Sequence, residues 1–140
     1  MSAVHEPART LKPMLIAGAW VDAPEQAFES VNPATGQTNF LISAASEAQV
    51  DQAVDAARQA VRQPAWRDIL PHKRAAVLRA IADGMERNAD TLARLQMIEN
   101  GKVWRECQAQ VASAAATFRY YAGVCETMTA EVTPPRGNYL

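Results

Sequence analysis

The stretch "QMIENGKVWREC", residues 96–107, joins two helical patterns and decides how the second half of the chain folds. Asn100 and Gly101 supply the left-handed residue with which many helices end, so the first helix is predicted to stop there. The last helix is predicted to begin at about Val103. Cys107 lies just beyond this start. The joint is therefore either part of a site with a reactive thiol or only a connection between two helices.

Helical periodicity continues on both sides of this joint. Upstream, a helix is predicted from Pro71, because proline is favoured at the first helical position, and Asn88 is expected to cap a further segment. The apolar stripe of the first of these helices is Val77, Leu78, Ile81 and Met85. The stripe of the last helix is Val111, Ala114, Ala115, Phe118, Tyr121, Ala122, Cys125 and Met128. Tyr120 is expected to be exposed and Tyr121 to be in the core.

A further helix is predicted between Ser46 and Pro64. "SEAQ", residues 46–49, has a capping hydroxyl followed three residues later by glutamine, the reciprocal pattern that satisfies free amides at a helix start. Proline is expected to stop this helix. Its narrow stripe consists of Val50, Ala53, Val54, Ala57 and Val61.

The first part of the chain is predicted to be extended. "MLIAGAWV", residues 14–21, indicates two short strands around Gly18. "FESV" and "TNFLISAA", residues 28–31 and 38–45, indicate two more around the turn "NPATGQ", in which Gly36 takes a positive φ. Residues 1–13 are expected to be a mobile tail, and "TPPRG" with "NYL", residues 133–140, to end the last helix and begin another strand.

Composition limits the function classes. The 140 residues form one domain at most, and a net charge of −1 from 14 basic and 15 acidic side chains gives no positive field for a nucleic acid. The longest early apolar run is too short to span a bilayer. We therefore expect a cytoplasmic protein with reduced cysteines and neither a nucleic acid nor a membrane as its partner.

No candidate catalytic group has the neighbours that catalysis needs. Cys107 has no histidine or tight loop nearby, and Cys125 lies on an apolar stripe. His5 and His72 lie among polar residues and are expected to be solvated. The six glycines are isolated, so they form no phosphate-binding loop. Lys102 is expected to complement the helix dipole rather than to bind an anion.

The succession of motifs is more specific than any single one. "NPATGQ", "AWR", "ERNADTLARLQMIENGK" and "FRYYAG" follow one another along the chain. In this order and spacing they resemble the N-terminal part of the NAD(P)-dependent aldehyde dehydrogenase superfamily, from about Leu15 to Leu140. Val103 stands where the family commonly has a proline after Gly-Lys, which leaves the course of the joint open.

The resemblance implies an α/β fold. Residues 14–140 would be the N-terminal portion of the family's Rossmann-like cofactor-binding domain, incomplete in this chain and ending at the start of the oligomerisation strand. The partner of such a segment is expected to be the remainder of an aldehyde dehydrogenase chain, or another copy of itself. A free-standing helical interaction module derived from the family is the alternative.

The resemblance also implies what the chemistry requires. Complete members use a cysteine nucleophile, a glutamate base and an asparagine to oxidise an aldehyde to an acid with NAD or NADP. Neither Cys107 nor Cys125 has the family's "GQxC" context, so the isolated chain is expected to be inactive and to bind no cofactor. Many members hold potassium or sodium through backbone carbonyls, which here correspond to Ser30, Val31 and Glu99. The joint is either part of such an ion site or a plain glycine-capped turn.

Overall fold

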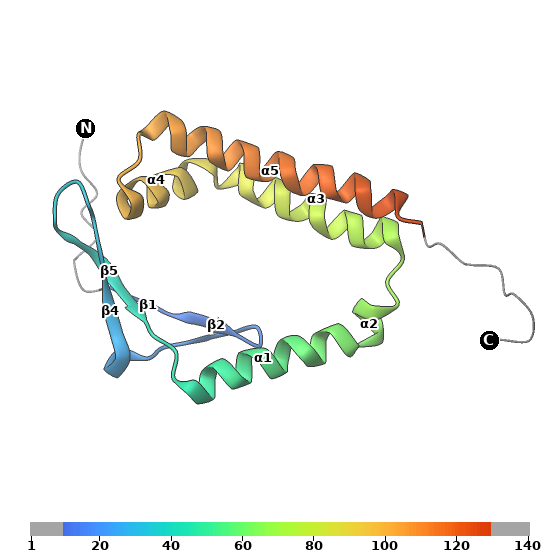
Figure 1. Cartoon of the computed structure of the whole chain (residues 1–140), viewed down its shortest axis with the longest axis horizontal. Coiled ribbons are helices and arrows are strands. Elements are labelled where there is room, and N and C mark those ends of the chain that lie inside the picture. The colour runs from blue at the N-terminus through green and yellow to red at the C-terminus, as the bar shows by residue number, and fades with distance from the viewer. Residues whose placement is uncertain (1–9, 130–140) are drawn as a thin grey trace, which may run out of the picture.

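The computed structural model describes residues 10–129, which form short strands followed by long helices (Figure 1). The strands are β1 (Leu11–Lys12), β2 (Met14–Ile16), β3 (Ala19–Val21), β4 (Ala27–Val31) and β5 (Thr38–Ser43), with a 3-10 turn, η1 (Pro24–Gln26), before β4. The helices are α1 (Glu47–Arg62), α2 (Pro64–Arg67), α3 (Pro71–Arg87), α4 (Ala89–Asn100) and α5 (Trp104–Thr127). The order of strands and then helices is the one predicted from the sequence.

The strands form two small sheets. β2 and β3 pair as an antiparallel hairpin, and the second sheet has the order β1-β5-β4. The expectation that ordered structure starts only after residue 13 is wrong, because Leu11 and Lys12 pair in parallel with Leu41 and Ile42 of β5. A two-residue strand shows no periodicity, so only its partner reveals it. Residues 1–9 lie outside the described residues.

The turn between β4 and β5 forms as "NPATGQ" predicted. The Asn32 carbonyl accepts hydrogen bonds from the Thr35 and Gly36 amides at 3.3 and 2.8 Å, and its side-chain Oδ1 accepts from the Ala34 amide at 2.9 Å. Gly36 has φ 69°, as expected. The two strands therefore leave the turn in a fixed antiparallel register.

Helix α1 begins with the predicted capping box. The Ser46 hydroxyl accepts from the Gln49 amide, and the Gln49 side chain accepts from the Ser46 amide. Pro64 ends α1, but it also starts the four-residue helix α2 as a first-turn proline, which the sequence reading missed. α1 has no buried residue, so within residues 10–129 its apolar stripe is only partly covered, and Val50 and Val54 remain about half exposed.

The helical half consists of α3, α4 and α5, with α5 lying antiparallel along α3 in Figure 1. Small side chains make this contact: Ala75, Ala82, Ala115 and Ala122 are all 0% exposed. Val77 and Ile81 of the predicted apolar stripe each remain 41% exposed, so α5 covers only part of that stripe. Close approach of two helices needs alanine on the shared face, and the larger residues then point elsewhere.

One of the two adjacent tyrosines also differs from expectation. Tyr120 and Tyr121 are 67% and 56% exposed, and their rings meet edge to face with centroids 5.2 Å apart. The assignment of Tyr121 to the core is therefore wrong for this part of the chain. The predicted helix break and the strand at residues 133–140 lie outside the described residues.

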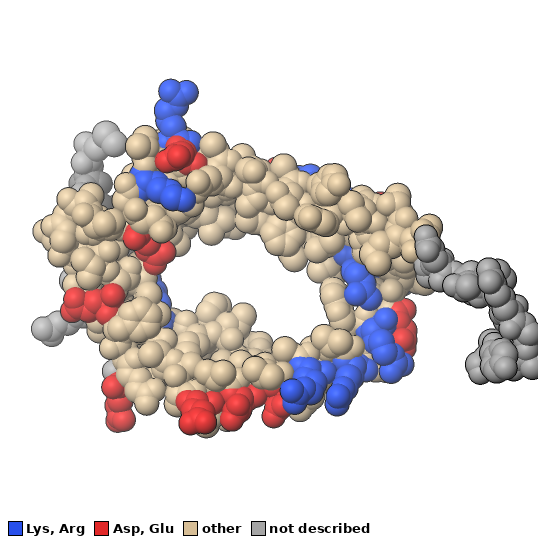
Figure 2. Space-filling model, viewed as in Figure 1, with Lys and Arg blue, Asp and Glu red and all other residues tan. Residues whose placement is uncertain are grey.

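The strand half, which comprises β1–β5, α1 and α2, meets the helical half mainly at its two ends. Figure 2 shows a hollow between the halves, with the charged side chains of α1 gathered on the outer rim. No helix within residues 10–129 is both long enough and apolar enough to cross a membrane.

Candidate functional site

The candidate site lies where the joint between α4 and α5 meets the β4–β5 turn. Gly101 adopts φ 68°, and its amide donates to the Met97 carbonyl at 2.9 Å, so α4 ends in the predicted left-handed stop. A Cβ atom at Gly101 would lie only 2.8 Å from Cγ of Pro33. The backbone of the joint therefore packs closely against the turn. Glycine allows this approach because it has no Cβ atom.

The strand side of this contact is a β-bulge. β4 and β5 pair in constant register from Ala27↔Ser43 to Ser30↔Phe40, but the next pair is Val31↔Thr38. Asn39 is therefore the extra residue on β5. A bulge redirects a side chain out of the regular ladder, and here the Asn39 amide is directed towards α4.

The Asn39 amide joins the two halves. Its Nδ2 donates to Oγ of Ser30 on β4 at 3.4 Å and to the Ile98 carbonyl at the end of α4 at 3.0 Å. The predicted carbonyl residues Ser30 and Val31 on one side, and Glu99 on the other, are thus brought to facing elements. Sequence reasoning predicted these three residues but missed Asn39.

At Glu99 the backbone carbonyl suits the kind of ligand that potassium and sodium take from proteins. The last carbonyls of a helix have no partner inside it, and within residues 10–129 the Glu99 carbonyl accepts no hydrogen bond. Carbonyl oxygens can replace the hydration shell of a monovalent cation. Side chains, in contrast, form no candidate metal centre: within the described residues, no three or more His, Cys, Asp or Glu residues are grouped so that they could hold a metal ion.

Lys102 has a local structural role. Its Nζ donates to Oε1 of Gln110 on α5 at 2.9 Å, and Gln96 of α4 donates to the same oxygen. The ammonium therefore ties the joint to the first turns of α5. This contact supports neither an anion site nor the predicted interaction with the end of α4.

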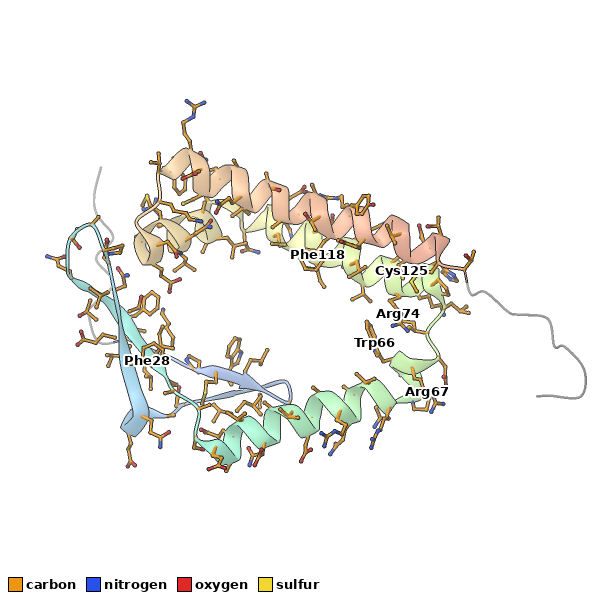
Figure 3. All side chains as sticks on the ribbon, in the orientation of Figure 1. Phe28, Trp66, Arg67, Arg74, Phe118 and Cys125 are labelled. Carbon is orange, nitrogen blue, oxygen red and sulfur yellow. The ribbon has the colours of Figure 1, made fainter. Side chains whose placement is uncertain are left out.

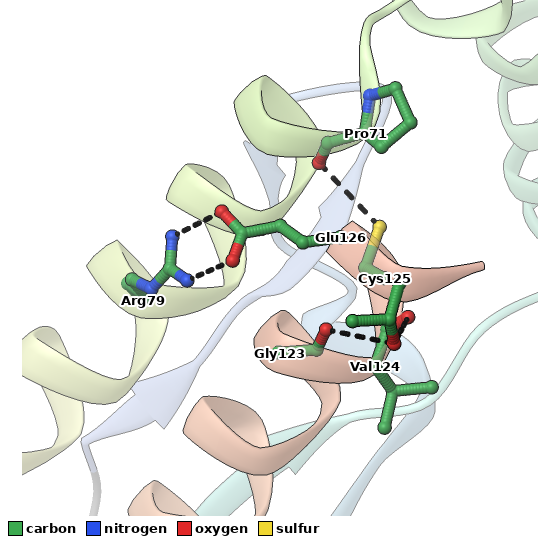
Figure 4. A network of polar contacts seen from close by, with 7 residues as sticks. Pro71, Arg79, Gly123, Val124, Cys125 and Glu126 are labelled. Carbon is green, nitrogen blue, oxygen red and sulfur yellow. Dashed lines mark hydrogen bonds and ion pairs between the residues drawn. The ribbon is translucent and has the colours of Figure 1, made fainter.

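Neither cysteine is placed as a nucleophile. Cys107 is 0% exposed and packs with Ala93 and Val111 in the cluster under the α4–α5 joint. Cys125 is half-buried, and its thiol lies 3.7 Å from the Pro71 carbonyl (Figure 4). His72 is exposed at the start of α3, and His5 lies outside the described residues. The described thiols therefore have structural surroundings, as the sequence indicated.

Ion pairs hold α3 and α5 together along their exposed edges. Arg119 donates to Asp83 at 2.7 Å and to both oxygens of Glu86. Arg79 donates to both oxygens of Glu126 at 3.0 and 2.6 Å (Figure 4). The hydrogen bond from Arg119 lowers the pKa of Glu86, and that from Arg79 lowers the pKa of Glu126. These groups are fully engaged with each other and offer no unpaired acid or base.

The opposite end of the molecule has a second link between the halves. Arg74 of α3 lies over the Trp66 ring of α2, with its guanidinium carbon 4.8 Å from the ring centroid, and it also donates to the Trp66 carbonyl at 3.0 Å (Figure 3). Within "AWR", tryptophan is therefore a packing surface for the start of α3. The sequence reading attached no role to this pair.

The model of the aldehyde dehydrogenase family matches residues 20–140, most of the chain. The chain belongs to this family. The resemblance drawn from the four motifs is thereby confirmed.

Similar proteins are complete aldehyde dehydrogenases of much greater length. DhaS of Bacillus subtilis, which carries an aldehyde dehydrogenase name, is 38% identical over 92% of this chain and 26% of its own. An aldehyde dehydrogenase of Bacillus cereus superimposes with a TM-score of 0.85 at 30% identity, over 93% of this chain and 27% of that one. Betaine aldehyde dehydrogenase of Staphylococcus aureus, solved with NAD+, gives 0.84 at 26% identity, over 91% and 26%.

The chain thus spans about a quarter of the length of the relatives it matches. The predicted fold class is confirmed as well: this mixed α/β segment corresponds to part of the aldehyde dehydrogenase cofactor-binding domain. The hollow between the strand half and the helical half therefore lies in a segment that, in those relatives, is one portion of a larger fold.

Proposed function

We propose that this chain contributes the N-terminal part of an oxidoreductase that converts an aldehyde to a carboxylic acid with NAD or NADP. The observation that supports it is the close superposition of nearly the whole segment on complete aldehyde dehydrogenases, one of them holding NAD+. In such an enzyme a thiolate attacks the aldehyde, hydride passes to the nicotinamide, and water releases the acid. The segment's own contribution is structural, because its described thiols are packed into helix contacts.

A chimera tests this proposal. Residues 20–140 would replace the matching segment of the Bacillus cereus aldehyde dehydrogenase, and formation of reduced nicotinamide would be followed with a panel of aldehydes. We expect the chimera to retain activity, because the backbone course is shared. A folded but inactive chimera would contradict the proposal and favour a non-catalytic helical interaction module.

We further propose that the 140 residues alone do not oxidise aldehydes. Covalent catalysis needs an accessible, activated nucleophile with a base nearby, whereas Cys107 is fully buried and Cys125 faces a backbone carbonyl. The same nicotinamide assay on the isolated chain should give no turnover. Turnover that disappears in Cys107→Ser would overturn this proposal.

The candidate site adds an ion to the proposal. The carbonyls of Ser30, Val31 and Glu99 would hold potassium or sodium, and the ion would supply positive charge that fastens the α4 end to β4. Backbone ligands make the side chain of Glu99 secondary, so Glu99→Ala should weaken ion-dependent stability less than Gly101→Val, which displaces the backbone. Equal losses of thermal stability in both variants, independent of the cation, would count against the ion.

A further inference from the structure

The two sides of the proposed ion site come from elements that touch very little elsewhere. Ser30 and Val31 end β4 in the strand half, whereas Glu99 ends α4 in the helical half. Carbonyl ligands bind an ion only when their spacing is held, because each contributes a partial charge at a fixed distance. Some group must therefore fix α4 relative to the bulge.

Asn39 has the position and the chemistry to do this. As the extra residue of the bulge it makes no regular pair with β4, and its side chain bonds to one of the carbonyl residues and to the neighbour of another. It donates to the Ser30 hydroxyl, next to Val31, and to the carbonyl of Ile98, which forms the peptide bond to Glu99. Because a peptide unit is planar, holding the Ile98 carbonyl also orients the backbone that leads into Glu99.

We infer that Asn39 is a positioning residue for the carbonyl site, acting through the backbone of Ile98 and the side chain of Ser30. This inference rests on the proposed ion site and adds to it the residue that sets its geometry. Pro33 against Gly101 limits how closely the halves approach, and the Asn39 amide prevents them from separating. Hydrogen-bonding partners of ligands in other metal sites change affinity by about 10–100-fold when removed.

The test uses thermal melts of the 140-residue chain in potassium, sodium and tetramethylammonium chloride at equal ionic strength. The quantity compared is the potassium or sodium concentration that gives half of the cation-specific rise in melting temperature. We expect Asn39→Leu, which removes both donors, to raise this concentration by about tenfold or more. Thr38→Val is the matched control: it removes the 2.9 Å hydrogen bond from the neighbouring β5 side chain to Glu29 and leaves both bonds of Asn39, so its value should stay near that of the wild type.

Asn39→Gln keeps the amide but moves it by one methylene group, and it serves if Asn39→Leu does not fold. We expect it to raise the half-effect concentration by a smaller factor. If Asn39 only stabilises the fold, these variants will melt lower in every salt with an unchanged half-effect concentration, and the inference is overturned. If the wild type melts identically in all three salts, the ion proposal itself fails and the inference falls with it.

Discussion

The pyrrolidine ring of Pro33 lies against the α-carbon of Gly101, so that a single added methyl group would approach Cγ of the ring to 2.8 Å. This contact places the β4–β5 turn beside the end of α4. Gly101 is constrained twice, by its left-handed backbone and by the ring beside it. The two constraints can be separated by mutation.

Gly101→Ala should lower the free energy of unfolding by at least about 1 kcal/mol. A left-handed conformation costs a residue with a Cβ atom about 1–2 kcal/mol, and the clash with Pro33 adds to this cost. Urea denaturation of the chain measures the change. In a double-mutant cycle, Pro33→Ala should relieve the clash but not the backbone strain. A coupling free energy of zero between the two mutations would show that the Pro33 ring moves aside without cost and that the clash contributes nothing.

Gly123→Ala is the matched control for this glycine. Gly123 lies inside α5, and a Cβ atom there would meet nothing within 4 Å. Alanine favours a helix interior over glycine by about 0.5–1 kcal/mol. We therefore expect Gly123→Ala to raise stability, and a loss similar to that of Gly101→Ala would contradict the assignment of strain to the joint.

Acidification should weaken the contact between α3 and α5. The carboxyl groups of Glu86 and Glu126 have a folded-state pKa below the ordinary value of 4.5, because Arg119 and Arg79 hydrogen-bond to them. Their contribution is therefore present above pH 4.5 and is lost as the pH falls through the lowered folded-state pKa values. The melting temperature should fall over this range, and less so in an Arg119→Gln variant. Parallel curves for the two proteins would contradict this link.

The two cysteines should differ in reactivity and in their tolerance of serine. Cys107 is fully buried, so a thiol reagent should modify Cys125 first and Cys107 only on unfolding. Cys107→Ser should cost about 1–3 kcal/mol if its hydroxyl finds no partner. Cys125→Ser should cost less, since a hydroxyl there can donate to the Pro71 carbonyl. Mass spectrometry after brief labelling identifies the modified residue, and early labelling of Cys107 would contradict its burial.

The features predicted correctly from the sequence depend on neighbouring residues. Ser46 and Gln49 form a capping box within one turn, and Gly101 ends α4 through its own backbone angles. Such signals lie within a few residues, so a sequence shows them directly. The succession of motifs then identified the family, which no single local pattern could do.

The features missed depend on residues far apart in the chain. Asn39 meets Ile98 across 59 positions, and the bulge that directs it appears only when β4 and β5 are paired. Which residues of α3 meet α5 also depends on a distant part of the chain. The apolar period predicted the stripe that contains Val77 and Ile81, but it did not show that Ala75 and Ala82 are the residues that α5 buries.

The last prediction concerns the partly exposed stripe of α1. Val50, Val54 and Val61 are 50%, 49% and 62% exposed, and contiguous apolar surface of this kind marks an interface or an aggregation site. We expect the 140-residue chain to associate with itself or with a partner that covers this stripe. Val54→Lys should reduce self-association measured by sedimentation at several concentrations, whereas Gln52→Lys, at an exposed polar position of the same helix, should not. A wild-type chain that sediments as a monomer at every concentration, with a sharp thermal transition, would contradict the prediction and indicate that the helices satisfy their own apolar faces.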